Sequence, residues 1–104
     1  MYGLVVRFML KDGATADFDR LVRETVPEIH KHEPGTLVYA VHQVEGEPQV
    51  RVFYELYRDR AAFEEHERQE HTTRFLAERH RYLSGPPQVD FLDLQAVAGA
   101  VEAR

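Results

Sequence analysis

Four segments of this chain combine β-branched and aromatic residues in the pattern that is typical of strands. They are residues 2–10 (YGLVVRFML), 36–44 (TLVYAVHQV), 50–57 (VRVFYELY) and 89–94 (VDFLDL). Residues 45–48 (EGEP) lie between the second segment and the third, and we interpret them as a four-residue hairpin loop. The pattern therefore predicts that these two strands pair.

The first segment with helical spacing lies between the first two predicted strands. Its apolar face comprises Phe18, Leu21, Val22, Thr25 and Ile29. Thr15 is a suitable N-cap, and Pro34-Gly35 ends the segment. Because an interior proline removes a backbone hydrogen bond, Pro27 predicts a kink near Val26 or two short helices.

The second helical segment covers residues 60–83, with Asp59 as its expected N-cap. Its early inward face comprises Ala62, Phe63 and His66. Its later inward face comprises Thr72, Phe75, Leu76, Arg79 and Leu83. The two faces are out of phase on one straight helix, so we expect a break between residues 68 and 70.

The predicted order βαββαβ favours a ferredoxin-like α+β sandwich, in which a four-stranded antiparallel sheet carries its helices on one face. We expect one domain over residues 1–104, with a core of about 2–95 and a frayed tail at 96–104. Residues 4–8 and 50–57 carry apolar side chains on both faces of their strands. The face without helices is therefore expected to pack on a second copy of the chain as a homodimer.

Composition narrows the chemistry. The 104 residues carry a net charge of −5, and acids and bases are interleaved, which argues against nucleic acid as a partner. No apolar run approaches the roughly 20 residues of a membrane span, and no secretory signal is recognisable, so we expect a cytoplasmic protein. The sequence has no cysteine, which excludes thiolate chemistry. Any reaction must depend on His, carboxylate, Tyr or Arg, and the expected partner is a small molecule or another copy of the chain.

Three titratable residues could meet at one site: Glu55 on the third predicted strand, and His66 and His71 beside the predicted break. A carboxylate among aromatic residues is either exposed at a sheet edge or buried with a partner. His66 points toward the sheet, where it is either a satisfied core residue or a proton carrier. Two imidazoles and a carboxylate together could exchange protons near neutral pH.

Other candidates are less specific. Arg7 lies within an apolar strand, so it either pairs with Glu55 or with an acid of a second subunit, or it anchors an anionic ligand. His42 could face either side of its strand. The i, i+5 spacing of His66 and His71 does not place them on one helical face, so we expect no metal site. The glycines match no phosphate-binding or dinucleotide-binding motif, so no cofactor is expected.

Two motifs carry a family resemblance. Residues 32–39 (HEPGTLVY) are followed by residues 53–75, in which Phe53-Tyr54-Glu55-x-Tyr57-x-Asp59 precedes Ala62-Phe63-x-x-His66-x-x-x-x-His71-x-x-x-Phe75. This arrangement resembles the antibiotic biosynthesis monooxygenase family, which includes quinol monooxygenases, within the dimeric α/β-barrel superfamily. The likeness covers about residues 2–94.

The resemblance implies a pocket between sheet and helices in each subunit of a sheet-to-sheet dimer. Relatives oxidise anthrones or hydroquinones with molecular oxygen, without metal or flavin. The implied catalytic residues are His66, His71 and Glu55, with one histidine as base and Glu55 orienting it. The substrate-binding set comprises Arg7, Tyr39, His42, Tyr54, Phe63 and Phe75.

The family also contains other activities. Haem-degrading relatives carry Asn and Trp where this chain has Arg7 and His66, which argues against haem degradation. The resemblance implies a cofactor-independent monooxygenase that acts on a quinol-like or anthrone-like aromatic. The alternatives are an isomerase or other proton-transfer enzyme acting on a small oxygenated metabolite, and a dimeric ligand-binding module without catalysis.

Overall fold

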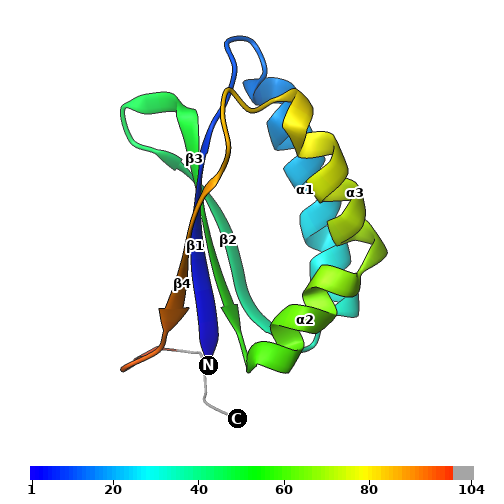
Figure 1. The fold of residues 1–104 in the computed structure, drawn as a ribbon, viewed down its shortest axis with the longest axis vertical. Helices are drawn as coiled ribbons and strands as arrows, with labels where there is room; N and C mark the ends of the chain where they lie inside the picture. Colours follow the sequence, from blue (N-terminus) through cyan, green and yellow to red (C-terminus); the bar gives the residue numbers. More distant parts are fainter. Residues whose placement is uncertain (100–104) are drawn as a thin grey trace.

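The computed structural model describes residues 1–99, in which a four-stranded sheet is covered on one face by helices (Figure 1). The elements follow in the order β1 (Tyr2–Met9), α1 (Thr15–His32), β2 (Thr36–Val44), β3 (Glu47–Tyr57), α2 (Arg60–Arg68), α3 (Glu70–Glu78), the 3-10 turn η1 (Arg79–Arg81) and β4 (Gln88–Asp93). The sheet order is β2-β3-β1-β4, and every neighbouring pair is antiparallel. The predicted ferredoxin-like α+β fold is confirmed.

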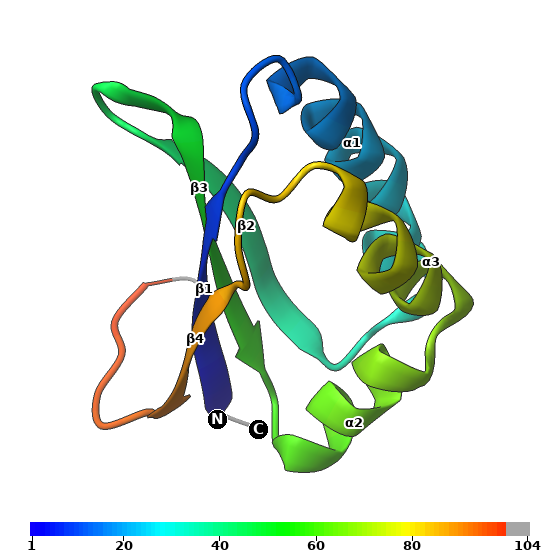
Figure 2. The same ribbon diagram turned by 45° about the horizontal axis from the view of Figure 1, so that its top comes forward.

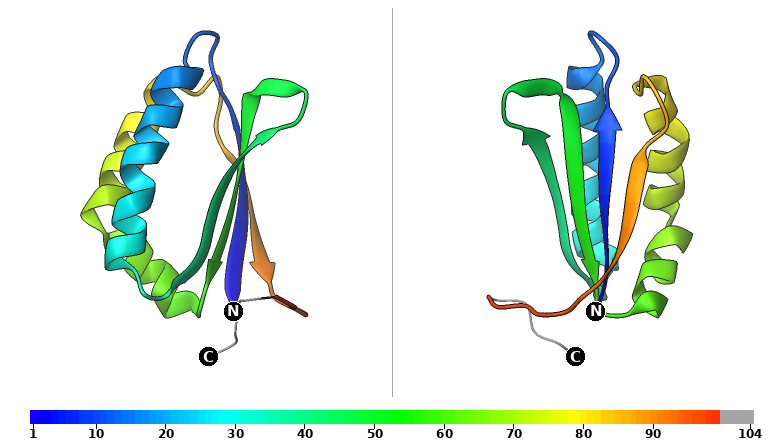
Figure 3. Two further views of the ribbon diagram at one scale, coloured as in Figure 1. Left: turned by 180° about the vertical axis from the view of Figure 1, so that it is seen from behind. Right: turned by 60° about the vertical axis from the view of Figure 1, so that its left-hand side comes forward.

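The helices share one side of the sheet because the strands alternate. In β1, Leu4, Val6 and Phe8 are buried toward the helices, whereas the residues between them face the other way. Figures 2 and 3 show α1, α2 and α3 on the same side of the sheet. Within residues 1–99, none of the helices has both the length and the apolar character that crossing a membrane requires.

An aromatic cluster fills the space between the layers. Phe8 and Phe53 of the central strands contact each other edge to face, with ring centroids 4.7 Å apart. Phe18 of α1 and Phe75 of α3 contact Phe53 at 6.1 and 5.8 Å. Because these four rings come from both layers, they fix the separation between sheet and helices.

The predicted break in the second helical segment is confirmed. α2 ends at Arg68 and α3 begins at Glu70, while Gln69 between them is extended, with φ −68° and ψ 143°. Asp59 caps α2 as expected, because its side chain accepts a hydrogen bond of 2.8 Å from the Ala62 amide.

The structure corrects two predictions about α1. It is a single 18-residue helix that continues through Pro27, so the prediction of two short helices is wrong. Pro27 is exposed, and water can satisfy the carbonyl that loses its partner there. Thr15 is also not the N-cap: Ala14 holds that position without a side-chain hydrogen bond.

The hairpin loop between β2 and β3 is shorter than predicted. Val44 pairs with Glu47, which leaves only Glu45 and Gly46 in the turn. Gly46 has a positive φ of 80°, which glycine adopts without the steric cost of a side chain. At the other end of the chain, residues 96–99 form no helix or strand, and the rest of the predicted tail lies outside the described residues.

The loop after α1 lies directly against α2. The Arg58 amide donates to the Gly35 carbonyl at 2.9 Å, and a Cβ atom at Gly35 would lie 2.6 Å from the Ala62 Cβ. Only a residue without a side chain allows this approach. The contact fixes the end of α1 relative to the helix that carries His66.

We predict that Gly35→Ala lowers the free energy of unfolding by about 1–3 kcal/mol, the usual cost of overpacking. Chemical denaturation measures the change. Gly85→Ala is the matched control, because no atom lies within 4 Å of the added methyl group. Ala62→Gly should recover part of the loss in the double variant, and strictly additive effects would contradict the proposed clash.

Candidate active site

A cavity of about 150 Å³ lies between the sheet and the α2–α3 segment. Its lining comprises Leu4, Val6, Phe8, Thr25, Tyr39, Phe53, Glu55, Phe63, His66, Glu67, Thr72, Phe75, Leu76, Arg79, Val89 and Phe91. Val89 and Phe91 belong to the edge strand β4 and are 44% and 58% exposed, so the cavity opens along this edge. Most of the lining is apolar, and the few polar groups in it therefore define its chemistry.

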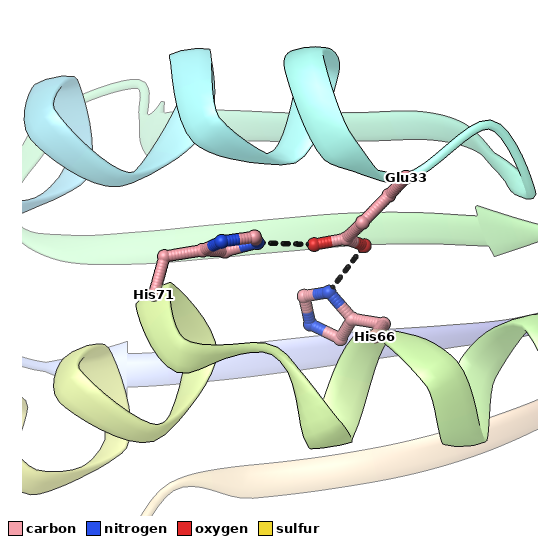
Figure 4. A group of neighbouring side chains, drawn as sticks. All are labelled: Glu33, His66 and His71. Carbon is pink, nitrogen blue, oxygen red and sulfur yellow. Dashed lines mark hydrogen bonds and ion pairs between the residues drawn. The ribbon is translucent and has the colours of Figure 1, made fainter.

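Glu33, directly after α1, is the centre of the polar network beside this cavity (Figure 4). Its side chain is only 2% exposed. One carboxylate oxygen, Oε1, accepts a hydrogen bond from Thr36 Oγ1 at 2.7 Å and lies 2.7 Å from His66 Nδ1. The other oxygen, Oε2, contacts His71 Nε2. One buried carboxylate thus joins residues from α2, α3 and the start of β2.

The pKa of Glu33 determines the proton arrangement. Burial would raise it, but hydrogen bonds from His66, Thr36 and His71 hold the pKa of Glu33 below its ordinary value of 4.5. Glu33 is therefore ionised near neutral pH and accepts the Nδ1–H of His66. In neutral His66 the lone pair is then on Nε2, the nitrogen 3.9 Å from Glu55 Oε1.

Glu55 has the opposite electrostatic character. Burial raises its pKa above 4.5, although the Tyr57 hydroxyl donates a hydrogen bond of 2.5 Å to its Oε1 atom. Burial likewise raises the pKa of Tyr57, which keeps that hydroxyl protonated. His66 therefore lies between two different carboxylates: the lowered pKa of Glu33 favours its ionised form, whereas the raised pKa of Glu55 disfavours its ionised form. Such a pair is typical of proton-transfer sites.

Aromatic rings hold the His66 imidazole in place. Its ring centroid lies 5.6 Å from that of Tyr39 and 5.3 Å from that of Tyr57. Burial raises the pKa of Tyr39 well above its ordinary value, so its hydroxyl stays protonated. The cavity also contains one cation, Arg79, whose guanidinium lies over the Phe8 ring at 5.4 Å.

Sequence comparison identifies the family. The family model described as antibiotic biosynthesis monooxygenase matches residues 1–78, three quarters of the chain. The chain belongs to the antibiotic biosynthesis monooxygenase family. No curated protein matches it.

Solved structures of similar proteins show the same fold. A structure described as an antibiotic biosynthesis monooxygenase is 27% identical, with a TM-score of 0.83 over 92% of this chain and 100% of that one. A Pseudomonas aeruginosa protein is also 27% identical, with a TM-score of 0.80 over 91% and 94%. A Mycobacterium tuberculosis protein is 23% identical, with a TM-score of 0.86 over 94% and 98%.

The structure brings most of the predicted site residues of this family member together. Those that line the cavity are Glu55, His66, Tyr39, Phe63 and Phe75. His71 joins the same network through Glu33, although it lines a groove between α1 and α3 instead of the cavity. The helix break makes this possible, because it turns His71 back toward the carboxylate that His66 contacts.

Three predicted substrate-binding residues lie elsewhere. Arg7, His42 and Tyr54 alternate with the helix-facing residues of their strands, so their side chains point to the face without helices. Within the single chain Arg7 forms an ion pair of 3.6 Å with Glu47. Its predicted pairing with Glu55 is wrong, because Glu55 points toward the helices.

Sequence reasoning missed Glu33 and Arg79 as site residues. Glu33 lies inside the HEPGT motif, and the proline and glycine after it were the available signal that its position is structurally defined. Arg79 belongs to the inward face predicted for the second helical segment, where an arginine is unusual enough to mark a site.

The spacing argument against a metal site does not hold in three dimensions. Glu33, His66 and His71 offer ligand atoms that all lie within 4.8 Å of one another. Two imidazoles and a carboxylate are a ligand set that binds zinc or iron. One nitrogen of each histidine, however, already lies at hydrogen-bonding distance from its own Glu33 oxygen, so a metal ion held at these atoms would have to displace these bonds.

We predict that Glu55→Gln becomes more stable, relative to the natural protein, as the pH rises from 4 to 8. The raised pKa of Glu55 means that its contribution to stability is present below 4.5 and is lost as the pH rises through its folded-state pKa. Glutamine keeps an acceptor for Tyr57 without the charge. Urea denaturation at several pH values measures the difference, and a constant difference would contradict the assignment.

Proposed function

We propose that this protein is a cofactor-independent monooxygenase that oxidises a quinol-like or anthrone-like aromatic with molecular oxygen. A hydroquinone and one molecule of oxygen would give hydroxybenzoquinone and water. One oxygen atom enters the ring as the new hydroxyl group, and the other leaves as water with the two hydrogen atoms that the substrate loses. An anthrone would exchange its methylene group for a carbonyl in the same way. The observation that supports this most is His66, which lines an aromatic-rich cavity: Glu33 holds its Nδ1, and its Nε2 lies 3.9 Å from Glu55 of the same lining.

His66 would act as the general base. Glu33 fixes the tautomer that leaves Nε2 free, and its charge stabilises the imidazolium that forms when Nε2 takes a proton. His71 donates to the other oxygen of the same carboxylate, which keeps Glu33 from rotating away. His71 would therefore be a positioning residue, and His66 the residue that contacts the substrate.

The remaining lining would favour the oxidation itself. Loss of the phenolic proton yields an electron-rich anion, which can pass an electron to molecular oxygen without a metal or flavin. Apolar walls from Phe53 and Phe75 exclude water from this anion and from the oxygen intermediate. Burial raises the pKa of Glu55, so its protonated form could return a proton to the reduced oxygen.

We predict that the protein consumes oxygen with a hydroquinone in metal-free buffer and that His66→Gln lowers kcat about 100-fold to 10,000-fold. Glu33→Gln should lower kcat as well, because the His66 tautomer is no longer fixed. The exposed His30→Gln is the matched control. Mass spectrometry after a reaction under isotopically heavy oxygen gas should find one labelled atom in the product.

Other outcomes identify the alternatives. Turnover without oxygen would favour an isomerase, and hydrogen peroxide as the product would indicate an oxidase. Activity that a chelator removes and zinc or iron restores would assign the cluster of Glu33, His66 and His71 to a metal. Unchanged kcat in His66→Gln would contradict the proposed mechanism.

We also propose that the chain forms a homodimer through the face of the sheet without helices. Apolar side chains on this face include Val5, Val52, Tyr54 and Leu92, and Leu92 is 36% exposed. A partner sheet would cover them.

We expect Tyr54→Glu to halve the molar mass in analytical ultracentrifugation, because a charge would then face the partner sheet. Thr73→Glu, on the exposed side of α3, is the control and should leave the mass unchanged. A natural protein that sediments as a monomer at every concentration would contradict the dimer.

A further inference from the structure

Arg79 is the one cation that lines the cavity in the described part of the chain, and it has no partner there. It is the first residue of η1, directly after α3. Its Nε atom is buried and forms no hydrogen bond, and within residues 1–99 its guanidinium forms no ion pair. A buried donor without an acceptor is costly, so this group is where a ligand oxygen would be most stabilising.

The protein groups around Arg79 do not neutralise it. Phe8 lies under the guanidinium and offers only the face of its ring. Burial lowers the pKa of Arg79, while Tyr39 and Glu55 raise it. Tyr39 stays protonated, and within residues 1–99 neither Tyr39 nor Glu55 forms a hydrogen bond or ion pair with the guanidinium. The cavity can therefore accept an anion.

The size of the cavity limits the ligand. Apolar protein cavities of about 150 Å³ bind a single benzene-sized molecule. The volume here is the same, and Phe53 and Phe75 supply ring surfaces on its apolar side. A fused three-ring system would have to extend through the opening beside Phe91.

We propose that Arg79 is the anion anchor of this cavity and that the ligand is a single-ring aromatic whose phenolate oxygen pairs with the Arg79 guanidinium. The inference rests on the proposed function, since it names the substrate class of the same site. Unlike that function, it can be tested by measuring ligand binding, without any turnover. Arginine suits the role because its donors form a planar fork that stays charged.

The competing explanation is that Arg79 only packs on Phe8 and helps to close the end of the core. A structural role would affect every ligand and the stability of the fold equally. An anion anchor affects only ligands that carry a charge.

The test uses 4-nitrophenol, because its phenolate absorbs at a different wavelength from the neutral phenol and does not react with oxygen. Titration of the natural protein should show binding and a pKa of the bound phenol below that of free phenol. Arg79→Met should weaken phenolate binding about 10-fold to 100-fold, as expected for losing a charged hydrogen bond. The pKa of the bound phenol should rise in parallel.

Three controls separate recognition from folding. Nitrobenzene, the neutral analogue, should bind the natural protein and Arg79→Met equally well. Arg79→Lys keeps the charge and should restore part of the phenolate affinity. Arg81→Met changes an exposed arginine of the same turn and should change neither ligand's affinity.

Equal phenolate affinity in Arg79→Met and the natural protein would overturn the anchor, as would equal losses for phenolate and nitrobenzene. A three-ring phenol that binds as tightly as 4-nitrophenol would overturn the assignment of a single-ring ligand. The absence of any 4-nitrophenol binding by the natural protein would also overturn it. If 4-nitrophenolate binding depends on Arg79 but the protein takes up no oxygen with a hydroquinone, the anchor is supported and the monooxygenase is rejected.

Discussion

The buried carboxylate of Glu33 is the interaction on which the site depends. It is attached to the end of α1, yet its partners are Thr36 at the start of β2, His66 on α2 and His71 on α3. A buried charge is tolerated only when its hydrogen bonds are satisfied, so the four segments must meet in one arrangement. The same bonds that stabilise this carboxylate fix the orientation of the His66 imidazole beside the cavity.

Two local features make this arrangement possible. Gln69 is extended, which separates α2 from α3 and lets two histidines five residues apart reach one carboxylate. Gly35 allows the loop after α1 to contact Ala62 closely. Neither residue lines the cavity, but each helps to determine where Glu33, His66 and His71 are placed.

The cavity has an uneven charge distribution. His66 sits beside an ionised Glu33, whereas Glu55 is buried in surroundings that disfavour its charge. Arg79 adds a guanidinium whose buried Nε forms no hydrogen bond within the described residues. Membership of the antibiotic biosynthesis monooxygenase family is consistent with such a site. Family membership accounts for the fold, whereas the proposed function depends on these few polar groups.

The sequence by itself determined the order of elements, the helix break and the inward direction of His66, because these follow from local hydrophobic periodicity and capping. It also indicated that Glu55 and both histidines could meet, and the structure places Glu55 and His66 in the cavity and His71 beside it, on Glu33. The tertiary structure alone placed Arg79 in the cavity and Glu33 beside it, and put Arg7, His42 and Tyr54 on the opposite face of the sheet. Strand register assigns each side chain to one face of the sheet, and loop packing brings residues from distant segments together. Both depend on contacts between residues that are far apart in the sequence.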